Sequence, residues 1–171
     1  MEQEYISLRN RYLPTDLKIV FVLESPPQGH GYVYNPEGRI SEVLFRAFMK
    51  LIDFIPTDKN EGLQELAKRG YLLVNPVYIP VNKLPDEEAD EIIVGNYNKF
   101  KKDLDLLIGV NKDIPIVLVK SNILRLLEKP MLDDGYNIVN HGLLIPFPLH
   151  YHINTFLDRT NSLISKVNSN K

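Results

Sequence analysis

Apolar residues are grouped along this chain of 171 residues in two kinds of segment. Short runs of β-branched and other apolar residues have no regular polar position, which is typical of strands buried on both faces of a sheet. Longer segments repeat apolar residues every three or four positions, as amphipathic helices do. This pattern predicts strands at 17–23, 71–74, 114–119 and 136–140, and helices at 39–54, 62–69, 86–110, 121–128 and 152–167.

The predicted strands and helices alternate, which indicates parallel strands joined by right-handed helical crossovers. We therefore expect an α/β fold of three layers, α/β/α, around a central four-stranded parallel sheet. The sequence contains no internal repeat, low-complexity tract or linker. A chain of this length can bury one substantial core, so we expect residues 1–171 to form a single domain.

Cysteine is absent, which excludes disulfides and thiolate chemistry, and the amino terminus has no basic region followed by an apolar stretch. These features predict a cytoplasmic protein, and no apolar run is long enough to predict a membrane contact. The formal net charge of −2 excludes a surface coated with basic residues and leaves DNA as a partner through a local patch only. His150 and His152 have no cysteine or acidic pattern near them, so we expect no metal and no cofactor.

Two loops that contain prolines follow predicted strands. Residues 24–27 (ESPP) follow the first strand, and residues 145–149 (IPFPL) come after the fourth. Proline fixes its own φ and biases the residue before it toward extended backbone, so both loops leave their strands on defined paths. Ligands of open α/β sheets bind at the carboxyl ends of the strands. We therefore expect the two loops to form opposite walls of one pocket.

Four segments, in order along the chain, resemble motifs of the uracil-DNA glycosylase superfamily. Residues 23–27 (LESPP) stand where that superfamily has its water-activating loop, and 30–34 (HGYVY) are similar to its His-Gly-x-x-aromatic segment. Residues 70–75 (GYLLVN) end a strand with an asparagine, as does the segment that reads the uracil edge. Residues 146–149 (PFPL), with the helix after them, are similar to its Pro-Ser-Pro-Leu loop. The resemblance covers most of the chain and implies a uracil-DNA glycosylase-like domain.

The resemblance implies a hydrolase that cleaves the N-glycosidic bond of a damaged or deaminated base in DNA. A carboxylate steadies the cation-like sugar of that reaction and orients water, and this role falls to Glu24. An amide offers a donor and an acceptor at once, as a pyrimidine edge requires, and this role falls to Asn75. The implied residues are Glu24, Ser25 and His150 for catalysis, and Tyr34, Asn75, Pro26, His30 and Phe147 for binding the base.

The chain departs from the best-known branch of that superfamily at three positions. Ser25 stands where that branch has an aspartate, Pro27 where it has the tyrosine that excludes thymine, and Ile145 where it has a histidine. Glu24 is the nearest replacement carboxylate. His150, or His141 at the end of the fourth predicted strand, is the candidate to replace the lost donor.

Other interpretations of these residues stay open. Glu24 could cap a helix or pair with Arg39, Asn75 could fix a turn before Pro76, and Tyr34 could be a core aromatic. The fold could also act on a free nucleoside or another small molecule, or bind a nucleobase without catalysis. A basic strip beside the pocket favours DNA, and an enclosed pocket without one favours a small molecule. A pocket blocked by Ile145 and Phe147 favours a non-catalytic protein.

Overall fold

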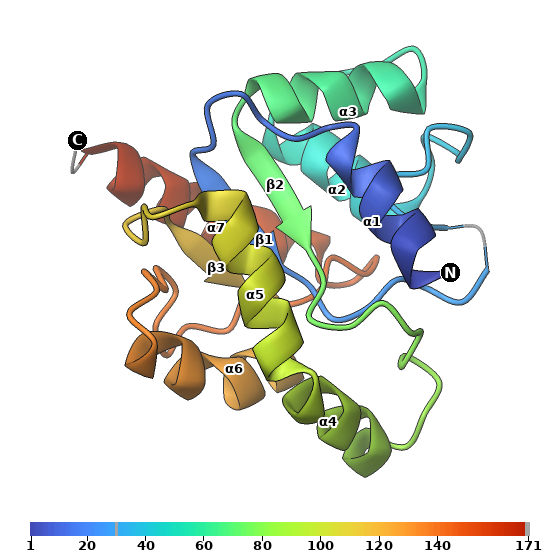
Figure 1. Cartoon of the computed structure of the whole chain (residues 1–171). Coiled ribbons are helices and arrows are strands. Elements are labelled where there is room, and N and C mark those ends of the chain that lie inside the picture. Colours follow the sequence, from blue (N-terminus) through green and yellow to red (C-terminus); the bar gives the residue numbers. More distant parts are fainter. Residues whose placement is uncertain (30, 170–171) are drawn as a thin grey trace.

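A parallel sheet of three strands lies at the centre of the computed structural model, which describes residues 1–29 and 31–169 (Figure 1). The strands are β1 (Ile19–Val22), β2 (Tyr71–Val74) and β3 (Ile116–Leu118), in the order β2-β1-β3. All residues of β1 and β3 are buried. Their continuous apolar sequences therefore match a sheet that is covered on both faces.

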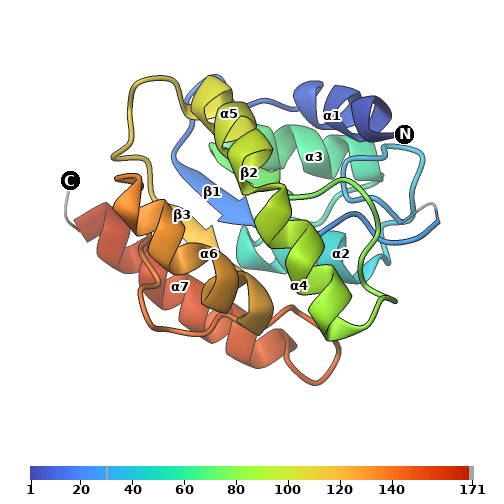
Figure 2. The ribbon, with the colours of Figure 1, turned by 60° about the horizontal axis from the view of Figure 1, so that its bottom comes forward.

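Helices cover both faces of this sheet. The chain passes from β1 to β2 through α2 (Val43–Leu51) and α3 (Lys59–Lys68), and from β2 to β3 through α4 (Asp86–Gly95) and α5 (Tyr97–Ile108). The first crossover runs from the central strand β1 to β2, and the second runs in the opposite direction across the sheet from β2 to β3, so the right-handed rule places them on opposite faces. Figures 1 and 2 show this arrangement, with α4 and α5 on the face opposite to α2.

The remaining helices close the fold around the sheet. On the α2 face, the ring of Phe48 contacts Phe21 of β1 at a centroid distance of 4.9 Å and Phe156 at 5.7 Å. The buried guanidinium of Arg9 donates hydrogen bonds to Tyr78 and Asp103, which ties the amino-terminal helix to α5. These contacts involve α1 (Glu2–Asn10) and α7 (Ile153–Ser169), while α6 (Ser121–Asp133) packs beside β3 and α4.

The predicted fourth strand is the main difference from the sequence-based expectation of a four-stranded sheet. Within the described residues, the segment 136–140 pairs with β3 only through an isolated bridge between Ile138 and Ile116. The side chain of Asn140 replaces the next backbone pair: its amide accepts from Leu118 N–H at 2.9 Å and donates to Leu118 C=O at 2.9 Å. Because a side chain occupies these two groups, the strand cannot continue beside β3.

Helix boundaries also differ from the prediction. The expected helix 86–110 is two helices that meet at Asn96. The side-chain amide of Asn96 donates to Pro76 C=O. The expected helix 121–128 continues to Asp133 despite Pro130. The helix α1 was not predicted, since its apolar periodicity is weak and the buried Arg9 holds it through tertiary contacts.

Candidate functional site

Each strand of the sheet is followed by a polar residue at its carboxyl end: Glu24 after β1, Asn75 after β2 and Lys120 after β3. Val22 pairs with Leu118 in the parallel register, so Glu24 and Lys120 lie level with each other two residues further along. A cavity of about 550 Å³ opens over this edge, and all three residues line it. The pocket thus forms where the loop argument expected it.

The carboxylate of Glu24 is held by two donors from the segment that starts α6. Lys120 Nζ and Asn122 Nδ2 each donate to Glu24 Oε1 at 2.6 Å. The Glu24 side chain is 11% exposed, so little solvent competes with these bonds. Among the described residues both donors engage the same oxygen, which leaves Oε2 as the atom that can accept from a water or a ligand.

Asn75 is 3% exposed and lines the same pocket. Among the hydrogen bonds of the described residues, none engages its side-chain amide, although buried amides are normally paired. Asn75 is therefore a buried wall residue of the cavity whose amide has no partner among the described residues.

Apolar groups form most of the remaining pocket wall. Pro26 and Phe147 come from the two loops that the sequence singled out, and they line the cavity together with Val43 and Leu44 at the start of α2. Ser25 also lines it, but its Oγ accepts from Val81 N–H at 3.2 Å and so fastens the loop after β2. Ile145 is fully buried and leaves the cavity open.

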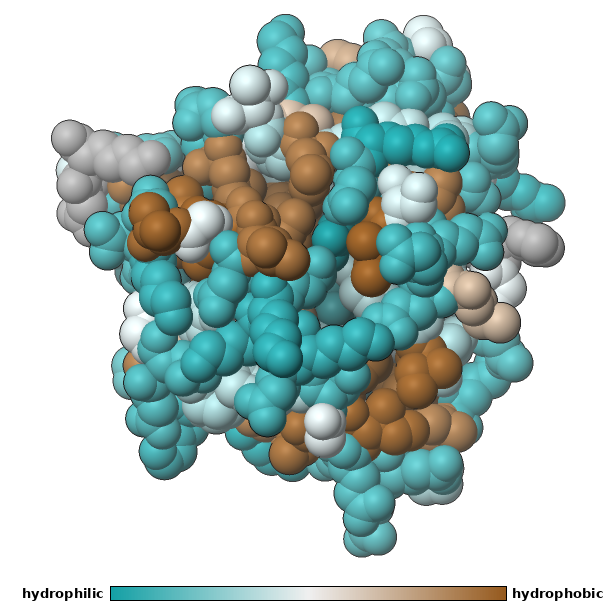
Figure 3. Space-filling model, in the orientation of Figure 1, coloured by the Kyte–Doolittle hydropathy of each residue, from teal (hydrophilic) through white to brown (hydrophobic). Residues whose placement is uncertain are grey.

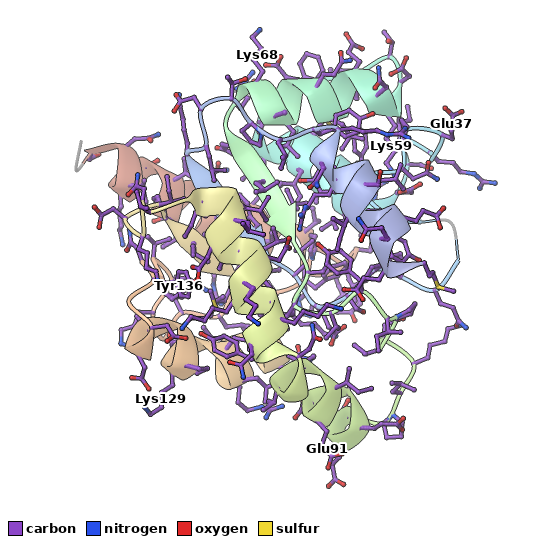
Figure 4. All side chains as sticks on the ribbon, viewed as in Figure 1. Glu37, Lys59, Lys68, Glu91, Lys129 and Tyr136 are labelled. Atoms are coloured by element: carbon purple, nitrogen blue, oxygen red, sulfur yellow. The ribbon has the colours of Figure 1, made fainter. Side chains whose placement is uncertain are left out.

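A second carboxylate, Glu42, reaches the pocket from the residue before α2. Its Oε2 accepts from Lys59 Nζ at 2.6 Å, and the same ammonium donates to Tyr32 C=O at 2.8 Å. Lys59, labelled in Figure 4, is buried, and burial lowers the pKa of its amine while the hydrogen bond to Glu42 opposes that shift. Gly38 leaves room for the pair, since a Cβ there would lie 2.6 Å from Lys59 Nζ.

Tyr34, the candidate for stacking on a base, does not lie at the pocket. It is 1% exposed within the core, and its hydroxyl accepts from Leu73 N–H at 2.8 Å. β2 is an edge strand, so this N–H points away from β1 and the tyrosine satisfies it. Burial raises the pKa of the Tyr34 phenol. The aromatic residues that line the cavity are Tyr32 and Phe147.

We expect Tyr34→Phe to lower the free energy of unfolding by about 1–3 kcal/mol, because the buried Leu73 N–H loses its partner. A stacking residue would tolerate this change, since phenylalanine keeps the ring. Urea unfolding compared with the wild type measures the effect. Unchanged stability together with weakened ligand binding would return Tyr34 to the site.

Neither His150 nor His141 lines the pocket. His150 is exposed and does not line the cavity. His141 Nδ1 lies 2.8 Å from Glu128 Oε1, and this contact holds the pKa of Glu128 below its usual range. His30 lies outside the described residues. A cation at the pocket comes instead from Lys120, which sequence analysis missed although it follows a buried strand just as Glu24 and Asn75 do.

Comparisons with known proteins do not identify the chain: no family model, no curated protein and no solved structure matches it.

Within residues 1–29 and 31–169, no three His, Asp or Glu side chains gather so as to hold a metal ion. In the same residues no helix has both the length and the apolar character needed to span a bilayer. Figure 3 shows polar residues over much of one face, with apolar patches between them, one of them beside α4.

Proposed function

We propose that this chain is a divergent, uracil-DNA glycosylase-like hydrolase that cleaves the N-glycosidic bond of a damaged or deaminated base in DNA. The observation that carries the proposal is the buried Asn75 in the wall of a cavity of about 550 Å³ that Glu24 also lines, with no partner for the Asn75 amide among the described residues. A cavity of this size holds a nucleobase, and its few convergent polar groups among apolar walls are typical of small-ligand sites. The motif segments 23–27, 70–75 and 146–149, which contribute residues to the pocket wall, support the same reaction.

In this proposal Asn75 binds the edge of the base. A uracil edge presents a carbonyl acceptor beside an N–H donor, and the amide offers the complementary pair. A donor aimed at the base carbonyl also stabilises the negative charge that the leaving base gains, and such a donor in a dry site contributes about 3 kcal/mol. The ring of Phe147 gives the base a stacking surface, a contact of roughly 1–3 kcal/mol.

Glu24 acts on the sugar side of the same bond. Lys120 and Asn122 fix Oε1 at 2.6 Å each, so Oε2 has a defined position from which it can orient water and stabilise the cation-like sugar. Ser25 does not act as a nucleophile in this scheme, because its hydroxyl is engaged by Val81 N–H. The loops fixed by prolines and the hydrogen bonds to Glu24 supply the preorganisation that such a reaction needs.

A free nucleoside is the second candidate substrate, and the charges of the pocket favour it. Among the described lining residues the charged groups are the carboxylates of Glu24 and Glu42 and one lysine, Lys120, which already binds Glu24. A DNA backbone requires cations that are free to neutralise phosphates, while a nucleoside has no phosphate. The two candidates share the base and the bond that is cleaved.

Single-turnover base release with enzyme in excess tests the proposal. The substrates are uracil-containing single-stranded DNA, the same strand in a duplex, and free deoxyuridine. We expect uracil release from at least one of them, and release confined to deoxyuridine would select the second candidate. No release from any of the three, with the enzyme shown to be folded, would contradict hydrolysis of uracil glycosides.

A further inference from the structure

Lys120 has a backbone conformation that lysine rarely adopts. Its φ is 84° and its ψ is 145°, a region that is essentially reserved for glycine because a Cβ is crowded there. The other non-glycine residue with positive φ in the described chain, Asp53 at 50°, lies in the left-handed region that aspartate tolerates. Lys120 is therefore the strained residue of this part of the fold.

Backbone hydrogen bonds on both sides of Lys120 impose this conformation. Its N–H donates to Ile145 C=O at 2.8 Å, which continues the parallel pairing beyond β3, and its C=O accepts from Leu124 N–H at 3.1 Å, which begins α6. One residue thus ends a strand and starts a helix. Glycine would make this turn without strain.

Lysine is also a poor choice at this position of a helix. Lys120 is the N-cap of α6, and its side chain makes no capping bond. Lysine has no side-chain acceptor for the free N–H groups of the first turn, and a cation at a helix amino terminus opposes the helix dipole. Local stability therefore disfavours lysine here for three independent reasons, and such a conflict is expected where function selects the residue.

The contacts of the Lys120 ammonium indicate why a lysine stands at this position. Lys120 Nζ donates to Glu24 Oε1 at 2.6 Å, and Lys120 and Glu24 line both the apolar pocket and a smaller, polar cavity of about 210 Å³ on the α4 side. The pair thus lies between the two cavities, together with Asn82. No other cation among the described residues contacts Glu24.

We propose that Lys120 is a positioning residue for the hydrolytic reaction: its strained backbone aims the ammonium at Glu24 and fixes that carboxylate at the boundary of the two cavities. This inference rests on the proposed function. Lys120 acts through Glu24 and does not bind the base, so its loss lowers kcat and leaves KM nearly unchanged. A misplaced catalytic group costs on the order of 100-fold in rate.

The test compares Lys120→Ala with Lys120→Gly, two variants that remove the same ammonium and differ in a Cβ. We expect both variants to reduce kcat about 100-fold. We expect Lys120→Arg, which keeps a cation, to retain a substantial part of the wild-type kcat. We expect the glycine variant to have a folding equilibrium constant roughly fivefold larger than the alanine variant. At an unstrained position the order is reversed, because glycine gives more freedom to the unfolded chain.

A double variant separates positioning from a general structural effect. With Glu24→Gln already present, Lys120→Ala should lower the rate no further, since the group that it positions is gone. Wild-type release with unchanged kcat in Lys120→Gly, or an alanine variant more stable than the glycine variant, would overturn the inference and leave the hydrolase proposal standing. A wild type that releases no base would overturn the hydrolase proposal, and the role of Lys120 with it.

Discussion

Replacing Glu24 by glutamine is expected to lower the single-turnover rate of base release about 1,000-fold, the largest effect of any single change in this pocket. Glutamine keeps the shape of the side chain and one oxygen for Lys120 and Asn122, so the fold should persist. It removes the negative charge that would stabilise a cation-like sugar and the second oxygen that would orient water. Rates measured at enzyme excess report this step without interference from product release.

Glu128→Gln is the matched control for that variant. Glu128 is also a partly exposed glutamate that accepts two hydrogen bonds, from His141 and from Gly142 N–H, but it does not line the pocket. We expect the control to release base at the wild-type rate. Equal losses in the two variants would mean that the rate follows general stability, and an active Glu24→Gln enzyme would remove Glu24 from the mechanism.

Replacing Asn75 by alanine is expected to lower kcat/KM about 100-fold, because the donor and the acceptor that read the base are both lost. The free energy of unfolding should change by less than about 1 kcal/mol, since the amide has no partner among the described residues. Asn75→Asp keeps an acceptor but adds a negative charge that repels the base carbonyl, so it should lower kcat/KM at least as much as Asn75→Ala does. Kinetics and urea unfolding of the same samples measure both effects.

Asn140 provides the comparison for Asn75, because it is a second buried asparagine at the carboxyl end of the sheet. Its amide bonds Leu118 on both sides and Leu143 C=O, so Asn140→Ala should destabilise the fold by about 2–3 kcal/mol. The two variants should thus differ in what they lose: Asn75→Ala loses binding, and Asn140→Ala loses stability. A large loss of stability in Asn75→Ala would assign Asn75 to the fold.

The sequence predicts the sheet and most helices because continuous apolar runs and helical periodicity are local signals. Residues 17–23, 71–74 and 114–119 contain the three strands of the structure. The failure at 136–140 has a tertiary cause, since the Asn140 side chain occupies the backbone groups of Leu118 that a fourth strand would need. A propensity pattern carries no information about such a replacement.

The candidate site follows a similar division. Glu24, Asn75, Pro26 and Phe147 all line one pocket, because strand ends and proline loops mark positions that topology brings together. Tyr34 does not, since its place was inferred from a motif and its hydroxyl is needed at the edge of β2. Lys120 could have been found by the rule that selected Glu24 and Asn75, but its strained φ is invisible in the sequence.

The central claim is that a nucleobase occupies the pocket that Asn75 and Glu24 line, and a titration of the ¹⁵N-labelled protein with uracil tests it most directly. The side-chain amide signal of Asn75 is assigned by its absence from the Asn75→Ala variant. The account predicts saturable shifts of that signal and of backbone amides in the loops around Glu24 and Phe147, with the Asn140 amide unmoved. Saturable shifts elsewhere, or none at millimolar uracil, would contradict it.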